Sequence, residues 1–324
     1  MAPSIFTRHP RYSIACGIGV LLILMLQLGG GPSYHAMSTF PRLYPPSKAG
    51  SMDVAWRLRK SEATYQQMVK QRATLIKQFG PTKEDIAPWP EHREFYTLWD
   101  FFTPAFNCPH ESERLGILGD GGKWVCGLSK IDPKPGCTIY SFGINDESSF
   151  EAALLEKTQY CQVWGYDFSV EDFGPEVRNI PYLKSRSHFF QWGLSGEDAP
   201  TANPPMYTLQ SLMKMNGHTF IDVLKVDVEG YEFPALRSFF EAFKGRMLPV
   251  GQLQLEIHAD RQPGVKDSDR FIEFLKWWEE LEEAGLRPFW TEPNLVFVNI
   301  NRGTPPALAE YSFINIKGDH DLLY

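Results

Sequence analysis

The stretch that decides the fold is Ile221 to Glu232, IDVLKVDVEGYE, in which a short apolar run ends in two carboxylates and a glycine. The residues at 223–226 include the β-branched and aliphatic side chains typical of a buried strand. Gly230 allows the backbone to turn, and the apolar spacing from Glu232 to Phe240 predicts a helix. The segment is therefore predicted to be a strand, an acidic turn and a helix.

Asp227 and Glu229 fall where this strand should end. In open α/β sheets ligands bind at the carboxyl ends of the strands, so acids at that edge are placed for binding or catalysis. An unpaired acid at the end of a buried strand is costly, which favours a functional role for Asp227. Glu229 and Glu232 have an alternative role, because the dipole of the following helix favours acids in its first turn.

Strands and helices alternate through the rest of the chain. We expect strands at Cys137–Phe142, Gln162–Tyr166, His188–Leu194 and Gly251–His258, and helices at Phe95–Phe106, Ser149–Lys157, Met206–Met215 and Phe271–Ala284. The last two strands, Leu286–Trp290 and Leu295–Ile300, are close enough to pair as a hairpin. This alternation predicts a doubly wound, Rossmann-like α/β sheet.

The composition limits the number of domains and the class of partner. The chain has 324 residues, of which 43% are hydrophobic and 14% aromatic, enough for one α/β domain with material left over. A net charge of -7 argues against a surface that follows phosphates, so nucleic acid is not an expected partner.

The remaining material lies at the amino terminus. Residues 13–28 form an uncharged apolar run that predicts a transmembrane signal anchor, with a cleaved signal peptide as the alternative. Residues 1–12 would be a cytosolic tail, 29–93 a stalk with a helix at Val54–Phe79, and 94–324 the globular domain. This predicts a single-pass type II membrane protein of the Golgi or endoplasmic reticulum, with its domain in the lumen.

Four cysteines lie beyond the apolar run, and their spacing matches no zinc motif, so no metal site is expected from them: Cys108, Cys126, Cys137 and Cys161. In an oxidising lumen Cys108 and Cys126 could form a disulfide that closes a loop around GDGGKWVC. Four unpaired, buried thiols are the alternative.

Two further segments have the features of a nucleotide-binding edge. After the strand at Cys137–Phe142 the chain turns through GINDE at residues 143–147, which lets a ligand approach the backbone. This turn has one glycine and two acids, unlike the Gly-x-Gly-x-x-Gly of pyrophosphate sites, so it favours a neutral or cationic group. Asp167 ends the next strand and can accept both hydroxyl protons of a ribose, although a turn or capping role is the alternative.

The segments YSFGINDESSFE, VWGYDFS, WGLSG, LKVDVEGYE and QLQLEIH, in this order, resemble the FkbM-type methyltransferases. With DGGKWVC upstream, the chain is similar to the methyltransferase-like proteins of eukaryotic membranes within that group, from about Cys108 to Ile316. The resemblance implies a class I methyltransferase fold and S-adenosylmethionine as methyl donor. The cofactor-binding residues that it implies are Phe142, Gly143, Asn145, Asp146, Asp167, Phe168, Gly193, Leu194 and Asp227.

By this likeness Gly143 would lie against the methionine end of the donor, Asp167 would hold the ribose and Asp227 would lie beside the transferred methyl group. The loop lacks the second glycine of the usual cofactor loop. The acceptor implied is a hydroxyl group on a sugar or another small molecule.

Methyl transfer to a hydroxyl needs alignment and a base that removes the hydroxyl proton. The candidate catalytic residues are Asp227, Glu229, Glu256 and His258. His258 ends the strand next to the acidic one and has an unperturbed pKa near neutrality, although strand-end histidines are often surface residues. Glu256 lies on the same face and can orient it.

Two other functions fit parts of the sequence. Asp227, Val228 and Glu229 resemble the Asp-x-Asp motif with which luminal glycosyltransferases hold Mn²⁺ against a nucleotide diphosphate, but few basic residues lie near it. The glycine-poor loop instead favours a catalytically silent domain that binds a partner.

Overall fold

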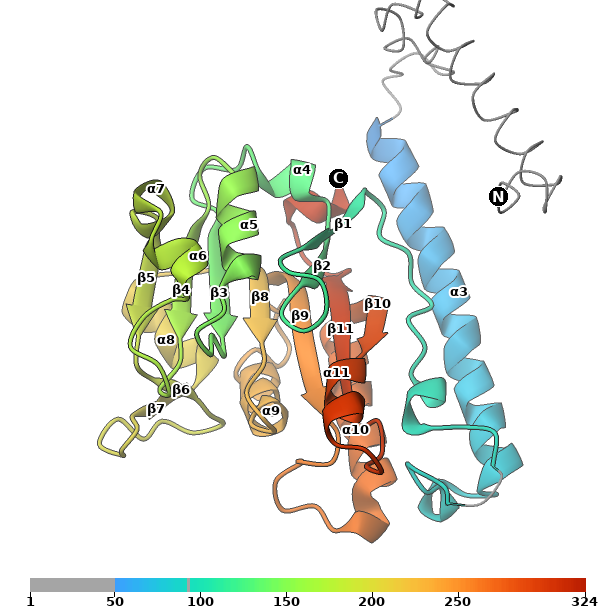
Figure 1. The fold of residues 1–324 in the computed structure, drawn as a ribbon. Helices are drawn as coiled ribbons and strands as arrows, with labels where there is room; N and C mark the ends of the chain where they lie inside the picture. The colour runs from blue at the N-terminus through green and yellow to red at the C-terminus, as the bar shows by residue number, and fades with distance from the viewer. Residues whose placement is uncertain (1–49, 92–93) are drawn as a thin grey trace, which may run out of the picture. The chain divides into compact units, whose positions relative to one another are not determined.

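The computed structural model describes residues 50–91 and 94–324, which belong to one compact unit (Figure 1). Its centre is a seven-stranded mixed sheet with the order β10-β11-β9-β8-β3-β4-β5. The strands are β3 (Thr138–Phe142), β4 (Gln162–Tyr166), β5 (Ser187–Phe190), β8 (Ile221–Val226), β9 (Val250–His258), β10 (Leu286–Pro293) and β11 (Leu308–Asn315). The first five are parallel, and β11 is antiparallel to both β9 and β10. This confirms the predicted Rossmann-like α/β sheet.

Helices cover both faces of the sheet. The longer ones are α5 (Ser149–Lys157), α8 (Leu209–Asn216), α9 (Glu232–Ala242) and α10 (Arg270–Ala284), and the single turns are α4 (Leu128–Ile131), α6 (Pro175–Arg178) and α7 (Pro181–Lys184). Alternate side chains of one strand enter two separate cores, as Tyr140 packs with the α8, α9 and α10 side chains and Ile139 with those of α5. Every residue of β3 and β8 is buried, which fits strands covered on both faces.

A small hairpin covers part of the α5 face. It consists of β1 (Ser112–Leu115) and β2 (Lys123–Cys126), which pair antiparallel. The side chain of Gln252 in β9 donates to the Cys126 carbonyl and accepts from its N–H, both at 3.0 Å, and Gln254 donates to the Trp124 carbonyl at 3.1 Å. These amides give the buried hairpin backbone its hydrogen-bond partners, so they fix it on the sheet.

The predicted hairpin at the end of the chain is partly wrong. β10 does pair with an antiparallel neighbour, but that strand is β11, whereas Leu295–Ile300 forms the short helix α11. The Asn294 side chain caps this helix by accepting from the Phe297 N–H at 2.9 Å. An apolar run of six residues fits a strand or a helix equally well, and the cap decides between them.

Three other elements differ from their predicted form. The strand expected at His188–Leu194 is divided into β5 and the two-residue β6 (Gly193–Leu194), which pairs with β7 (Met206–Tyr207) outside the main sheet. Residues 206–207 are therefore strand and not the start of α8. Phe95–Phe106 does cover the core, but only Leu98–Phe101 is helical. It forms a single 3-10 turn, at whose start the Asp100 carboxylate accepts a hydrogen bond from the Thr97 N–H.

Helix α3 (Gly50–Phe79) packs against the sheet domain, whereas the sequence predicted a stalk up to residue 93. Arg72 of α3 forms an ion pair with Glu282 at 2.7 Å, and Arg287 of β10 forms one with Glu62 at 2.8 Å. These long-range pairs join α3 to the end of α10 and to β10. The helix is therefore part of the globular unit.

The predicted membrane anchor at residues 13–28 lies outside the described residues. Among the residues that the structure describes, none of the helices combines the length and the apolar character that crossing a bilayer requires.

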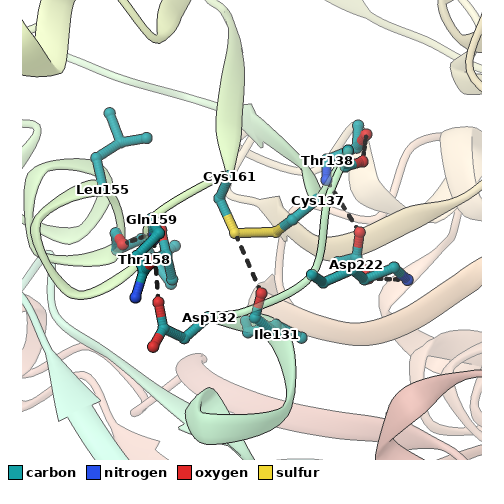
Figure 2. The surroundings of a disulfide bond; sticks show 12 residues. Ile131, Asp132, Cys137, Thr138, Leu155, Thr158, Gln159, Cys161 and Asp222 are labelled. Atoms are coloured by element: carbon teal, nitrogen blue, oxygen red, sulfur yellow. Dashed lines mark hydrogen bonds and ion pairs between the residues drawn. A yellow bond between two sulfur atoms is a disulfide. The ribbon is translucent and has the colours of Figure 1, made fainter.

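Two disulfides are present. Cys108 bonds to Cys126, which confirms the predicted pair and ties the hairpin to the segment before it. Cys137 bonds to Cys161 and joins the starts of β3 and β4, with Asp222 of β8 nearby (Figure 2). The sequence did not predict this second bond. Together they crosslink the amino-terminal half of the sheet domain.

Candidate functional site

A pocket of about 490 Å³ lies at the carboxyl ends of the parallel strands. It has the size range of small-molecule sites and the position at which open α/β sheets bind ligands. Its lining comes from the hairpin loop and from the segments that follow β3, β4, β5 and β8: Asp120, Gly121, Gly143, Ile144, Asn145, Glu147, Tyr166, Asp167, Phe168, Ser169, Trp192, Gly193, Leu194, Met206, Lys225, Asp227, Val228, Glu229, Tyr231 and Glu256.

The loop after β3 approaches the loop after β8 so closely that only glycine fits. A Cβ on Gly143 would lie 1.8 Å from the Asp227 carbonyl oxygen, and its φ of +81° is also unfavourable for other residues. Asn145 and Asp146 follow with φ of 46° and 58°. Asn and Asp tolerate this left-handed region better than most residues. Asn145 and Asp146 therefore adopt the left-handed backbone for which the usual cofactor loop has a second glycine.

Asp167 holds this loop in place. One carboxylate oxygen accepts from the Ile144 and Asn145 N–H groups at 2.8 and 3.0 Å, and the other accepts from the Ser169 N–H and hydroxyl at 2.7 and 2.6 Å. Burial opposes ionisation, but these hydrogen bonds outweigh it and lower the pKa of Asp167. Asp167 thus faces the pocket as a carboxylate, and a ribose would have to share or replace some of these donors.

Aromatic side chains form one wall of the pocket. Tyr166 stacks on Phe190 at a centroid distance of 5.4 Å, and Phe190 stacks on Trp192 at 4.7 Å. Phe168 is half exposed at the rim. A Cβ on Gly193 would meet the Met206 sulfur at 2.4 Å, so this wall is closely packed. Such a surface suits a flat heteroaromatic ring.

Four acids lie side by side on the face covered by α5 and the hairpin, and two of them, Asp227 and Glu256, line the other end of the pocket. In the strand register Glu256 of β9 is opposite Glu310 of β11, which is opposite Glu292 of β10. Asp227 directly follows the last residue of β8 and lies beside Glu256. Like charges in neighbouring strands repel each other, so this acid row (Asp227, Glu256, Glu310 and Glu292) needs compensation.

The two outer acids of the row each have a cation. Arg114 of β1 donates to both carboxylate oxygens of Glu292 at 3.2 Å, and the buried Lys123 of β2 forms an ion pair with Glu310. For the inner pair, Asp227 and Glu256, the described residues provide no cation within ion-pair distance. The inner pair is therefore the part of the row that can interact with a ligand.

Charge and burial shift the pKa values of the two inner acids in opposite directions. Burial tends to raise the pKa of Asp227, but the nearby Lys123 and Lys225 outweigh it and lower this pKa. Burial, together with the charges of Asp227 and Glu310, raises the pKa of Glu256 to about 9. At neutral pH Asp227 is then ionised and Glu256 carries the proton. Glu256 also accepts a hydrogen bond from the Asn294 amide at 2.8 Å.

Lys225 links the acid row to the cofactor-type loop. It lies on β8 two residues before Asp227, lines the pocket and donates to the carbonyl of Gly143. It also lies 3.6 Å from the buried carboxylate of Glu151 in α5. The ammonium group of Lys225 therefore holds the turn after β3 in place through the Gly143 carbonyl.

His258 lies next to the acids but does not line the pocket. Its ring is 1% exposed, with Nδ1 3.3 Å from Glu232 and Nε2 3.3 Å from Glu229. Burial lowers its pKa, but the hydrogen bond and charge of Glu232 outweigh this and raise it to about 9. A histidine that is charged at neutral pH is a poor proton acceptor, so the reason for choosing His258 as base does not hold.

The other predicted residues divide between the pocket and its surroundings. Those that line it are Gly143, Asn145, Asp167, Phe168, Gly193, Leu194, Asp227, Glu229 and Glu256. Phe142 and Asp146 do not. Phe142 is fully buried in the core, where it stacks on the back of the pocket residue Tyr166, and Asp146 is exposed beyond the turn. Glu229 is two-thirds exposed and is paired with Arg261.

Sequence reasoning missed both lysines and the outer acids. Lys225 could have been found, because its spacing of two residues from Asp227 puts both on one face of a strand. Lys123 lies in the DGGKWVC segment, but only the hairpin's position on the sheet brings it to the acid row.

A family model described as "Methyltransferase domain" matches residues 52–304 of the chain. The chain belongs to the methyltransferase-domain family. The match includes helix α3, in agreement with its packing on the sheet domain. The family assignment confirms the resemblance at the level of a methyltransferase domain, while the FkbM-type subgroup stays a prediction.

Curated relatives agree with the methyltransferase-domain family. The chain is 29% identical over 171 residues to "Probable methyltransferase-like protein 24" of Rattus norvegicus and 27% identical over 171 residues to the Homo sapiens protein of the same name. Each alignment covers 49% of this chain, 44% of the rat protein and 43% of the human protein. The alignment thus spans less than half of each relative.

Among solved structures, the fibrillarin pre-rRNA processing protein of Methanococcus jannaschii is similar to this chain with a TM-score of 0.35 and 12% identity. It covers 64% of this chain, which in turn covers 84% of that protein. At this score the likeness gives no information on the substrate.

Proposed function

We propose that this protein transfers the methyl group of S-adenosylmethionine to a hydroxyl group of a small molecule such as a sugar. The observation that carries the proposal is the pocket at the carboxyl edge, where a glycine-dependent turn, an aromatic wall and an ionised aspartate meet. The family assignment supports the reaction class.

The pocket residues fit this donor. The aromatic wall with Trp192 and the rim residue Phe168 would hold the adenine, and Asp167 would bind the ribose hydroxyls. The turn at Gly143 leaves space for the methionine end, because any side chain there would collide with the Asp227 backbone. S-adenosylmethionine would supply a methyl group on a positively charged sulfur, and the excess of acids in the lining favours a cation.

Asp227 and Glu256 would handle the acceptor proton. Asp227 is ionised and faces the pocket, so its carboxylate would accept a hydrogen bond from the acceptor hydroxyl and then its proton. Glu256 is protonated, so it would donate to the acceptor or to Asp227. Lys123 and Lys225 keep this order of protonation, since both favour the charged form of Asp227.

The charge of the lining limits the acceptor. It contains six acids (Asp120, Glu147, Asp167, Asp227, Glu229 and Glu256) and one lysine, Lys225. A phosphate or carboxylate group on the acceptor would be repelled, whereas the hydroxyl groups of a neutral sugar can donate to carboxylates. This supports a neutral polyhydroxyl acceptor and argues against nucleic acid.

We also infer a luminal location, in the endoplasmic reticulum or Golgi, with the apolar run at residues 13–28 as a membrane anchor. The two disulfides support it, because such bonds persist in oxidising compartments.

The test is a transfer assay with the full chain and S-adenosylmethionine labelled in its methyl group. The acceptors are neutral sugars, a sugar phosphate and an amine of similar size, and the control protein is Asp227→Asn. We expect label in a neutral sugar and a loss with the variant. Label found only in the amine would replace O-methylation by N-methylation, and no label with any acceptor would leave the proposal without support.

A further inference from the structure

We infer that Asp227, Glu256 and His258 form a binding site for a divalent metal ion of the Mn²⁺ or Zn²⁺ type. One ligand-type atom of each residue lies within 4.8 Å of the others. Two carboxylates and one imidazole nitrogen are a donor set that such ions accept. The inference rests on the proposed function for the role of the ion, though not for its binding.

The first argument is that the inner pair of the acid row lacks the direct ion pairs of its neighbours. Along the acid row Glu292 has Arg114 and Glu310 has Lys123, and Lys225 is paired with Glu151. Within the described ranges 50–91 and 94–324, the inner pair has no such partner. Two adjacent carboxyl groups that form no direct ion pair with a lysine or arginine leave oxygens free to coordinate a divalent cation.

The second argument is that Glu232, which is not one of the three proposed ligands, orients the His258 ring. The buried Glu232 carboxylate accepts from the His258 backbone N–H at 2.8 Å and lies 3.3 Å from the ring Nδ1. A carboxylate on one ring nitrogen orients the ring, so that the other nitrogen, Nε2, whose neighbour at 3.3 Å is the exposed Glu229 carboxylate, would bind the metal. Metal-binding histidines commonly have this support.

The third argument is the rigidity of the donors. Glu256 and His258 alternate on the same face of β9 and are 4% and 1% exposed, and the Asn294 amide holds one Glu256 oxygen. Asp227 follows the neighbouring strand β8. Sites on packed strands keep their geometry better than sites on loops.

A fourth oxygen is available from the next strand. A Glu310 carboxylate oxygen lies within 4.8 Å of one from Glu256, and Glu310 Oε2 is buried without a hydrogen-bond partner among the described residues. Asp227 and Glu256 also line the pocket. An ion between them would therefore have protein ligands on one side and an open side toward the acceptor, where it would bind a hydroxyl oxygen and favour transfer of the hydroxyl proton to the Asp227 oxygen that is not bound to the ion.

The experiment uses the full chain, freed of metals with a chelator, and titrates it with Mn²⁺ and in parallel with Zn²⁺ by calorimetry. Unbound Mn²⁺ is followed by its electron paramagnetic resonance signal. We expect one saturable site, no saturable binding in Glu256→Gln, and affinity about 10- to 100-fold weaker in Glu232→Gln, which does not touch the ion.

The matched control is Glu292→Gln, an acid of the same row that already has its own cation. It should leave the affinity unchanged. Lack of saturable binding of both ions, or equal weakening in Glu292→Gln and Glu256→Gln, would overturn the inference. Circular dichroism of each variant shows whether it is folded, and His258→Gln is a second variant if Glu256→Gln is not.

Titrating the metal-free chain with S-adenosylmethionine in the presence of the chelator distinguishes a failure of this inference from a failure of the proposed function. Donor binding without metal binding would leave the methyltransferase proposal standing and reject the ion. Loss of both would reject both.

Discussion

Strand β8 has an aspartate near each end, and their surroundings differ. Asp222 accepts from the Lys134 ammonium at 2.7 Å and from the Thr138 N–H at 2.9 Å. Asp227, five residues later, faces the pocket, and no described side chain donates a hydrogen bond to it other than a protonated Glu256. The same residue type on one strand is thus part of the scaffold at one end and available to a ligand at the other.

The two edges of the sheet show the same contrast. At the amino edge the Cys137–Cys161 bond and the pair around Asp222 satisfy the polar groups and crosslink the strands. At the carboxyl edge, like charges adjoin, and Asn145 and Asp146 adopt positive φ. Unpaired charge and an unusual backbone lower stability, and proteins retain them where a ligand is bound. We therefore assign stability to the first edge and function to the second.

The Asp227→Asn variant tests the contrast between the two edges of the sheet most directly. Methyl transfer should fall by about 10³-fold, because the group that takes the acceptor proton is lost. The free energy of unfolding should also fall, because the lowered pKa of Asp227 means that Lys123 and Lys225 stabilise its charge in the folded state, but the variant should stay folded. Labelled-methyl transfer and urea unfolding measure the two effects, and a variant that unfolds easily but still transfers methyl groups would reverse the assignment.

Removal of the disulfide at the opposite edge should act on stability alone. Replacing both Cys137 and Cys161 by Ser opens a crosslink across 24 residues of sequence. Unfolding free energy should fall by about 3 kcal/mol. Donor affinity, measured on the variant below its melting temperature, should change less than twofold. A large loss of affinity would show that the two edges are not independent.

Asp222→Asn is the matched partner of the Asp227 variant. It breaks a buried ion pair and should cost about 2 kcal/mol of unfolding free energy, with donor binding retained. Urea unfolding together with calorimetry checks this. If this variant lost donor binding as completely as Asp227→Asn loses transfer, Asp222 would not be a scaffold residue only.

The smallest expected effect is on the pH dependence of stability. The pKa of Glu256 is raised to about 9, above its value in the unfolded chain, so the folded state keeps a proton that the unfolded state releases. Its contribution to stability is complete at low pH and is lost as the pH rises toward 9, and we expect a decrease of at least about 1 kcal/mol between pH 6 and pH 8 in chelator.

Glu256→Gln should make that slope smaller, because the amide does not titrate, while the part of the slope that comes from the raised pKa of His258 stays. Melting temperatures at pH 6 and pH 8 for both proteins give the comparison. Equal slopes would mean that Glu256 is not protonated in the folded state.

Much of this arrangement was visible in the sequence. Four of the five parallel strands were predicted close to their observed bounds, because apolar runs buried on both faces differ clearly from the amphipathic helices between them, whereas the predicted strand at 188–194 continues past the end of β5. The positions of Gly143, Asp167 and Asp227 at the pocket followed from the rule that parallel strands end at one edge. Helix α11 was missed, since its apolar run is short and its cap is a single residue, Asn294.

The acid row could not be read from the sequence. Glu310 belongs to a strand that was not predicted, and its place beside Glu256 depends on the antiparallel register of β9 and β11. Lys123 comes from a hairpin whose docking on the sheet depends on long-range hydrogen bonds from Gln252 and Gln254. Such neighbours come from tertiary contacts, so local patterns do not report them.

The most direct test of the functional edge is calorimetric titration of the full chain with S-adenosylmethionine, beside Asp167→Ala and Asp222→Asn. We predict saturable binding by the natural chain and by Asp222→Asn, and affinity at least about tenfold weaker in Asp167→Ala, since it loses both the ribose acceptor and the bonds that hold the Gly143 turn. No saturable binding by the natural chain, or equal affinity in all three proteins, would contradict the placement of the donor site at this edge.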